Sequence, residues 1–172
     1  MQGPFDIAAD LDTPVSAFLK LAPLEPRYLL ESVAGGAHVA RYSFIGFGRA
    51  VETVIDVPPP TREALLSRLR AALADSPHPG PAVEDLPFEG GLVGFFGYDL
   101  VRCFERLPAA AAPRPGEPAG AWVATESLLV FDHATRRCAV LHDGDERARK
   151  NIRRDVVRAL RGAIPDFAAA ES

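Results

Sequence analysis

Two apolar, strand-like runs of this sequence carry polar side chains where they meet the segment that joins them. The first run ends on Glu31 and Ser32, and the second begins with Arg41, Tyr42 and Ser43. A site for a free amino acid needs a carboxylate for the ammonium group, hydroxyls or a cation for the carboxylate, and an apolar pocket for the side chain. These residues supply several of those groups. The plainer alternative is that Glu31 is a solvated strand end and Ser32 a turn residue.

No catalytic centre is recognisable in the rest of the sequence. The four histidines are scattered through predicted turns, without the spacing of metal ligands. Ser32, Ser43 and Ser127 lack the G-x-S-x-G context of a hydrolase nucleophile. We therefore predict no catalytic residue and no metal site in this chain.

A glycine-rich segment, GGLVGFFG, begins at Gly90 and resembles a phosphate-binding loop at first sight. Its spacing is neither the dinucleotide fingerprint nor a P-loop, and no Lys-Ser or Lys-Thr pair follows it. Glycines spaced three apart in an apolar run more often let a second backbone pack closely. We interpret Gly90, Gly91, Gly94 and Gly97 as structural.

The composition excludes several classes of partner. The chain has 172 residues, 48% of them hydrophobic and 24% charged, with a formal net charge of -4. A nucleic acid or an anionic membrane as the main partner is unfavourable at this charge. The basic residues between positions 146 and 162 surround an apolar stripe, which is typical of a solvated helix face. Cys103 and Cys138 are too few for a disulfide framework and are predicted to be buried thiols.

The first residues lack the basic start and apolar core of a signal peptide. No apolar run approaches the roughly 20 residues that a membrane-spanning helix needs. We expect a cytoplasmic protein with no membrane and no nucleic acid among its partners.

Helix caps, turn residues and hydrophobic periodicity predict the elements that position these groups. Thr13-Pro14 opens a helix that buries Val15, Phe18 and Leu19, and Thr61 caps a second helix. A third starts near Asp145. The predicted helices span 14–22, 62–75 and 145–161, and the predicted strands span 27–33, 40–48, 49–57, 121–133 and 136–143, with a buried strand and a short helix within 90–108. This pattern predicts one α+β domain, with a mostly antiparallel β-sheet and three or four packed helices.

Four segments resemble, in order, the N-terminal region of anthranilate synthase component I. They are LLESVAGG, RYSFIGFG, GGLVGFFGYDLVRCFERLP and SLLVFDH. The resemblance covers a core of about residues 11–164. It implies that residues 1–172 form the N-terminal domain of such an enzyme, without its catalytic chorismate-binding domain. The related aminodeoxychorismate synthase component I shares the pattern more loosely.

The resemblance also implies partners. The full enzyme is a lyase of tryptophan biosynthesis that converts chorismate to anthranilate, using ammonia that a glutamine amidotransferase subunit, component II, releases. Chorismate and Mg²⁺ bind in the C-terminal domain of that enzyme. We therefore expect this chain to bind no cofactor and to carry out no catalysis by itself. The expected partners are that domain, component II and L-tryptophan as feedback inhibitor.

In this family the LLES motif contacts the inhibitor, and the residue before the serine of the second strand lines the same site. The resemblance therefore assigns Leu30, Glu31, Ser32 and Tyr42 to an L-tryptophan feedback site. Family members with lysine at the Tyr42 position make the role of that side chain less certain. Two alternatives stay open: the N-terminal domain of aminodeoxychorismate synthase component I, and a non-enzymatic protein-interaction module that uses the glycine-rich strand or the basic helix.

Overall fold

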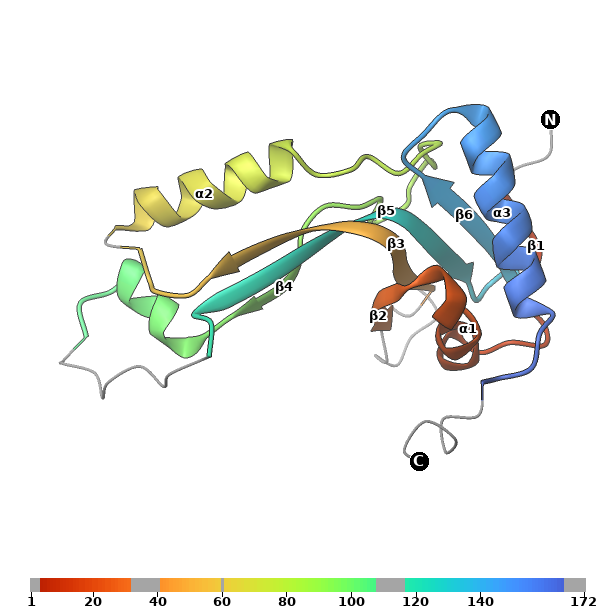
Figure 1. Ribbon diagram of the computed structural model, residues 1–172, viewed down its shortest axis with the longest axis horizontal. Helices are drawn as coiled ribbons and strands as arrows, with labels where there is room; N and C mark the ends of the chain where they lie inside the picture. Colours follow the sequence, from red (N-terminus) through yellow and green to blue (C-terminus); the bar gives the residue numbers. More distant parts are fainter. Residues whose placement is uncertain (1–3, 32–40, 60, 108–116, 166–172) are drawn as a thin grey trace. The chain divides into compact units, whose positions relative to one another are not determined.

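The computed structural model describes residues 4–31, 41–59, 61–107 and 117–165. Contacts between residues divide the chain into two compact units. Unit 1 comprises Met1–Ala50, His78–Gly90 and Thr125–Ser172, and unit 2 comprises Val51–Pro77 and Gly91–Ala124. Figure 1 shows the chain coloured along its sequence.

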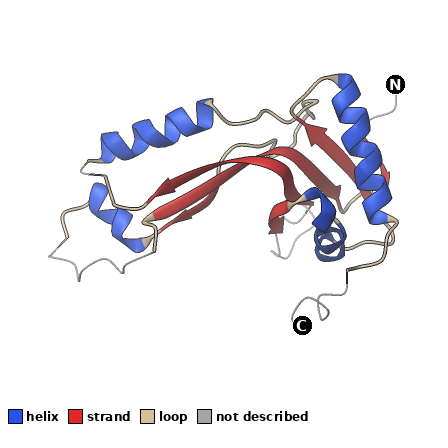
Figure 2. Ribbon diagram, in the orientation of Figure 1, coloured by secondary structure: helices blue, strands red, loops and turns tan. Residues whose placement is uncertain are grey.

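The described residues form one six-stranded sheet, in the order β1-β6-β5-β3-β2, with β4 paired to β5. The pairs β1–β6, β2–β3, β4–β5 and β5–β6 are all antiparallel. Figure 2 shows these strands together with the helices. The strands are β1 (Phe5–Ala8), β2 (Pro26–Glu31), β3 (Tyr42–Ile55), β4 (Val93–Phe96), β5 (Gly120–Asp132) and β6 (Arg137–His142). The predicted α+β class with a mostly antiparallel sheet is confirmed.

Three α-helices and two short 3-10 helices accompany the sheet in the described part of the chain: α1 (Pro14–Lys20), α2 (Arg62–Ala74), α3 (Glu146–Leu160), η1 (Ala22–Leu24) and η2 (Tyr98–Cys103). The N-caps of the α-helices are Thr13, Thr61 and Asp145, and each side chain accepts a hydrogen bond from a backbone N–H in the first turn. The predicted helix starts are therefore confirmed. Strand β1 was not predicted.

The core of unit 1 has two layers, one on each face of the sheet. Helices α1 and α3 pack on one face, against β2 and β6. The first cluster contains Ile7, Ala17, Leu21, Ile45, Phe47, Leu129, Phe131, Cys138, Val156 and Leu160. The second contains Phe44, Leu128, Val130, Ala139 and Leu141. Neighbouring residues of β5 alternate between the two clusters, as the pleat of a strand requires.

Helix α1 meets the core with only part of the side that the sequence predicts: Phe18 packs against the first core cluster, but Val15 does not. Val15 is 51% exposed, whereas Ala17 and Leu21 are fully buried. The buried pair stands four residues apart, on one side of the helix, and α1 contacts β2 and α3. The apolar residues of so short a helix do not define its buried side, because tertiary contacts set its rotation.

The core of unit 2 contains Ile55, Leu65, Leu100, Cys103 and Trp122. The glycines of the glycine-rich segment let β4 approach β5 closely: a Cβ on Gly94 would lie 2.0 Å from the Ala121 carbonyl oxygen. A Cβ on Gly97 would lie 2.6 Å from the Ala119 carbonyl oxygen. These distances support the structural interpretation of the segment. The prediction of a buried strand is wrong, because Phe95 and Phe96 on β4 are both exposed.

Cys103 and Cys138 are free thiols and both are buried, as predicted. Among the described residues, none of the helices combines the length and the apolar character that crossing a membrane requires.

Candidate functional site

The antiparallel register of β2 and β3 fixes where the predicted ligand-binding residues lie. Leu30 pairs with Phe44, and Glu31 pairs with Ser43. Because side chains alternate along a strand, Leu30 shares one face of the sheet with Phe44 and Tyr42, while Glu31 shares the other face with Ser43. Ser32 lies outside the described residues. The structure therefore brings Leu30 and Tyr42 to the same face and places Glu31 on the opposite one.

The face that carries Leu30 and Tyr42 is aromatic. The ring centroid of Tyr42 lies 6.2 Å from that of Phe44 and 6.3 Å from that of Phe5. The guanidinium carbon of Arg41 lies 4.8 Å from the centre of the Tyr42 ring, within range of a cation–π contact. Leu30 and Tyr42 both keep part of their surface accessible. This face of the sheet therefore presents an apolar side chain, a phenol and a guanidinium.

Arg41 is anchored by Asp132, at the end of β5. Its Nε lies 3.1 Å from Oδ1 of Asp132, and its Nη2 lies 2.8 Å from Oδ2. The Asp132 side chain is 3% exposed, and the Arg41 side chain is 45% exposed. The hydrogen bond from Arg41 is the main cause that lowers the pKa of Asp132, and the backbone N–H of Ala134 adds to it. Asp132 is therefore ionised at neutral pH and holds the guanidinium beside Tyr42.

On the opposite face, Glu31 is exposed and its carboxylate has no hydrogen-bond or ion-pair partner among the residues that the structure describes. Its neighbour Ser43 is buried, and the Ser43 Oγ lies 2.8 Å from Nε2 of His133. A serine–histidine pair resembles half of a hydrolase centre. Because only 2% of Ser43 is exposed, a substrate cannot reach its hydroxyl, and the pair joins β3 to the end of β5.

A second serine–histidine pair, Ser127 Oγ to His142 Nδ1 at 2.8 Å, joins β5 to β6. Ser127 is fully buried, so this hydroxyl is equally unavailable to a substrate. In the described part of the chain, no group of three histidine, cysteine or acidic side chains could hold a metal ion. Sequence reasoning did not find the partners of Arg41, Ser43 and Ser127. These partners are Asp132, His133 and His142, which belong to no recognisable motif.

The arrangement of strands and helices matches the fold of a solved structure. A crystal structure of anthranilate synthase component I from Streptococcus pneumoniae aligns with a TM-score of 0.56 and 23% identity, over 100% of this chain and 39% of that chain. At this identity the match shows the fold, which is the α+β arrangement described above. No protein-family profile matches the chain.

The sequence relatives are more specific. Anthranilate synthase component 1 of Streptomyces coelicolor is 46% identical over 133 residues, 77% of this chain and 24% of the relative. The proteins of the same name from Neisseria gonorrhoeae and Thermus thermophilus are 35% and 37% identical and cover 93% and 91% of this chain. The chain spans 37% and 35% of their lengths. The chain is thus homologous to anthranilate synthase component I and corresponds to the N-terminal part of that family's members.

Proposed function

We propose that this chain is the regulatory and structural N-terminal part of an anthranilate synthase component I, and that it supplies part of a feedback site for L-tryptophan. The observation that carries the proposal is the homology, which extends over most of the chain. The proposed parent enzyme is a cytoplasmic lyase that forms anthranilate from chorismate and ammonia. The same relatives favour this branch over aminodeoxychorismate synthase, because all three are anthranilate synthase component 1 proteins.

The geometry supports a role in the proposed site for the residues on the face that carries Leu30 and Tyr42. Leu30 and Tyr42 form an apolar wall for the indole ring, and Arg41 faces the ligand carboxylate with Nη1, which has no partner among the described residues. Glu31 lies on the opposite face of the sheet from Leu30 and Tyr42, so its proposed contact with the ammonium group rests on the family motif and not on the geometry. Ser32, from the family motif, adds a hydroxyl.

Catalysis is assigned to the part of the enzyme that this chain does not span. Chorismate and Mg²⁺ bind there in this proposal, and component II delivers ammonia. In this proposal another part of the enzyme docks on unit 2. Four exposed aromatic side chains of unit 2 support this: Phe95, Phe96, Tyr98 and Phe104. Exposed aromatic side chains are enriched at protein interfaces.

An NMR titration of the isotope-labelled 172-residue chain with L-tryptophan tests the site directly. A separate titration with L-phenylalanine is the control. We expect saturable, tryptophan-selective shifts at Leu30, Glu31, Ser32 and Tyr42, and at Arg41. Equal responses to both amino acids, or no response at millimolar concentration, would overturn the proposal that this chain carries the recognition groups.

Substitutions in the full-length enzyme test the regulatory role. Ser32→Ala and Glu31→Gln should weaken tryptophan inhibition and leave uninhibited turnover largely unchanged. Glu52→Gln is the matched control, because Glu52 is an exposed carboxylate elsewhere on β3. Unchanged inhibition by the first two variants would contradict the assignment, and a product other than anthranilate would contradict the proposed branch.

A further inference from the structure

A cavity of about 640 Å³ opens in unit 1, on the side of the sheet that α1 and α3 cover. It is formed by β1, the segment between β1 and α1, and the last turns of α3, and it is lined by none of the residues of the proposed tryptophan site. Its volume lies within the usual range for small-molecule sites, about 300–1,000 Å³. Ile7, Leu11 and Val157 give it an apolar wall.

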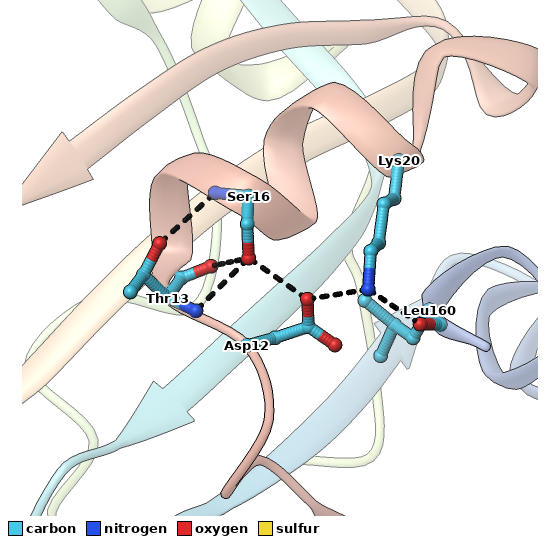
Figure 3. Close-up of polar contacts among 5 residues, drawn as sticks. All are labelled: Asp12, Thr13, Ser16, Lys20 and Leu160. Atoms are coloured by element: carbon cyan, nitrogen blue, oxygen red, sulfur yellow. Dashed lines mark hydrogen bonds and ion pairs between the residues drawn. The ribbon is translucent and has the colours of Figure 1, made fainter. Parts of the chain in front are cut away.

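Two ion pairs fix part of the polar lining. Asp6 accepts hydrogen bonds from Nε of Arg153, at 3.0 Å to Oδ1 and 2.9 Å to Oδ2. Lys20 Nζ lies 2.8 Å from Oδ1 of Asp12 and donates to the carbonyl oxygen of Leu160 at 2.9 Å (Figure 3). Both ends of this second pair are largely buried. These four charged groups therefore neutralise one another and hold the walls of the cavity in place.

The same Asp12 oxygen also accepts from the Ser16 hydroxyl, at 2.8 Å. Ser16 in turn belongs to the capping box of α1 with Thr13 (Figure 3). The other carboxylate oxygen of Asp12 has no contact with any residue drawn in Figure 3.

The cavity lining also contains one acidic and one basic residue outside these two ion pairs. Asp10 and the Arg161 side chain are exposed and have no hydrogen-bond or ion-pair partner among the residues that the structure describes. Leu11, between Asp10 and Asp12, is 96% exposed. The lining thus offers a spare carboxylate, a spare guanidinium and an uncovered apolar side chain. A simple anion would match only Arg161, and a simple cation only Asp10.

We propose that this cavity binds a small zwitterion with an apolar side group, of the chemical class of a free aliphatic amino acid. Asp10 receives the ammonium group, and Arg161 receives the carboxylate. Leu11, Ile7 and Val157 contact the apolar part. Charge-assisted hydrogen bonds at both ends fix the orientation of the ligand. The proposal does not rest on the tryptophan site.

An NMR titration of the labelled chain with four probes tests this assignment. L-leucine carries all three features, and each of the other probes lacks one: isopentylamine lacks the carboxylate, 4-methylpentanoate lacks the ammonium group, and glycine lacks the side chain. We expect saturable shifts from L-leucine at residues 6–12 and 153–161, and at least about threefold weaker binding of each other probe.

Asp10→Asn and Arg161→Gln should each weaken L-leucine binding by at least about threefold. Arg158→Gln is the matched control on α3, since Arg158 is exposed but does not line the cavity. Circular dichroism and thermal unfolding establish that the three variants fold alike. Equal binding of the four probes, no saturable shift at tens of millimolar, or unchanged binding by both variants would overturn the proposal. Shifts confined to residues 28–31 and 41–44 would overturn it too and would point to the other site.

Discussion

The ring of Tyr28 on β2 lies directly over Gly46, its register partner on β3. A Cβ added to Gly46 would lie 2.2 Å from Cζ of Tyr28, far inside van der Waals contact. The Tyr28 hydroxyl lies 3.2 Å from Oγ1 of Thr125, and burial raises the pKa of the phenol. The aromatic side chain is therefore held from two sides and cannot move aside at low cost.

Gly46→Ala should consequently lower the free energy of unfolding by about 1–3 kcal/mol, as other overpacking substitutions do. In a chain that already carries Tyr28→Ala, the same glycine substitution should cost much less, because the ring that it strikes is gone. Denaturant unfolding of the four proteins of this double-mutant cycle measures the coupling. Equal costs of Gly46→Ala in both backgrounds would contradict the structural argument.

Local signals predicted the helices and most of the strands. Thr13, Thr61 and Asp145 cap their helices by hydrogen bonds within three residues, so the necessary information is contained in a few neighbouring positions. Strand β1 was missed for the opposite reason. It has four residues, too few for a periodic pattern, and it forms by pairing with β6 at the other end of the sequence.

The partners within the candidate site lie beyond the reach of sequence patterns. Arg41 and Asp132 are 91 positions apart, and Ser43 and His133 are 90 apart. Alternation along two strands predicts that Glu31 and Leu30 face opposite sides of a sheet. It does not predict which distant side chain lies beside either of them, because strand order and register decide that.

The Arg41–Asp132 pair should stabilise the junction of β3 and β5. Asp132→Ala removes a nearly buried carboxylate that Arg41 and the Ala134 N–H both contact, and should lower the free energy of unfolding by about 1–3 kcal/mol. Urea unfolding at pH 7 measures the loss. Asp143→Ala is the matched control, since Asp143 is exposed and its side chain has no partner among the described residues. A loss of the same size in both variants would contradict a specific role for Asp132.

The contribution of Asp132 should also depend on pH. Its pKa is lower in the folded protein than in the unfolded chain, chiefly because of the hydrogen bond from Arg41. As the pH falls, the unfolded chain therefore binds the proton first. The stabilisation is complete above the unfolded pKa, about 3.9, and is lost as the pH falls through the folded value. The stability difference between the unmodified chain and Asp132→Ala should shrink between pH 5 and pH 2, in urea unfolding at each pH. A difference that is constant over this range would show that the pair contributes nothing through charge.

The two thiols should be unreactive in the folded chain. Burial, with a smaller effect of the nearby Asp12 carboxylate, raises the pKa of Cys138 to about 12. Burial also raises the pKa of Cys103, whose Sγ lies 3.2 Å from the Pro59 carbonyl oxygen. Because the thiolate is the reactive form, less than about a tenth of the thiol should react with Ellman's reagent at pH 8 until denaturant is added.

Single substitutions separate the two positions. The Cys103→Ala variant reports the labelling rate of Cys138 alone, and Cys138→Ala reports that of Cys103 alone. Cys138 should react more slowly, because it is fully buried whereas 9% of Cys103 is exposed. Above pH 9 the unfolded chain loses its thiol protons while the folded chain keeps them, so stability should fall as the pH rises toward 12. Cys138→Ala should flatten this alkaline decline, because it removes the thiol whose pKa burial raises to about 12. Rapid labelling of Cys138 in the native chain at pH 8 would show that unit 1 opens around β6, and that its core is less closed than the packing of α3 on β6 indicates.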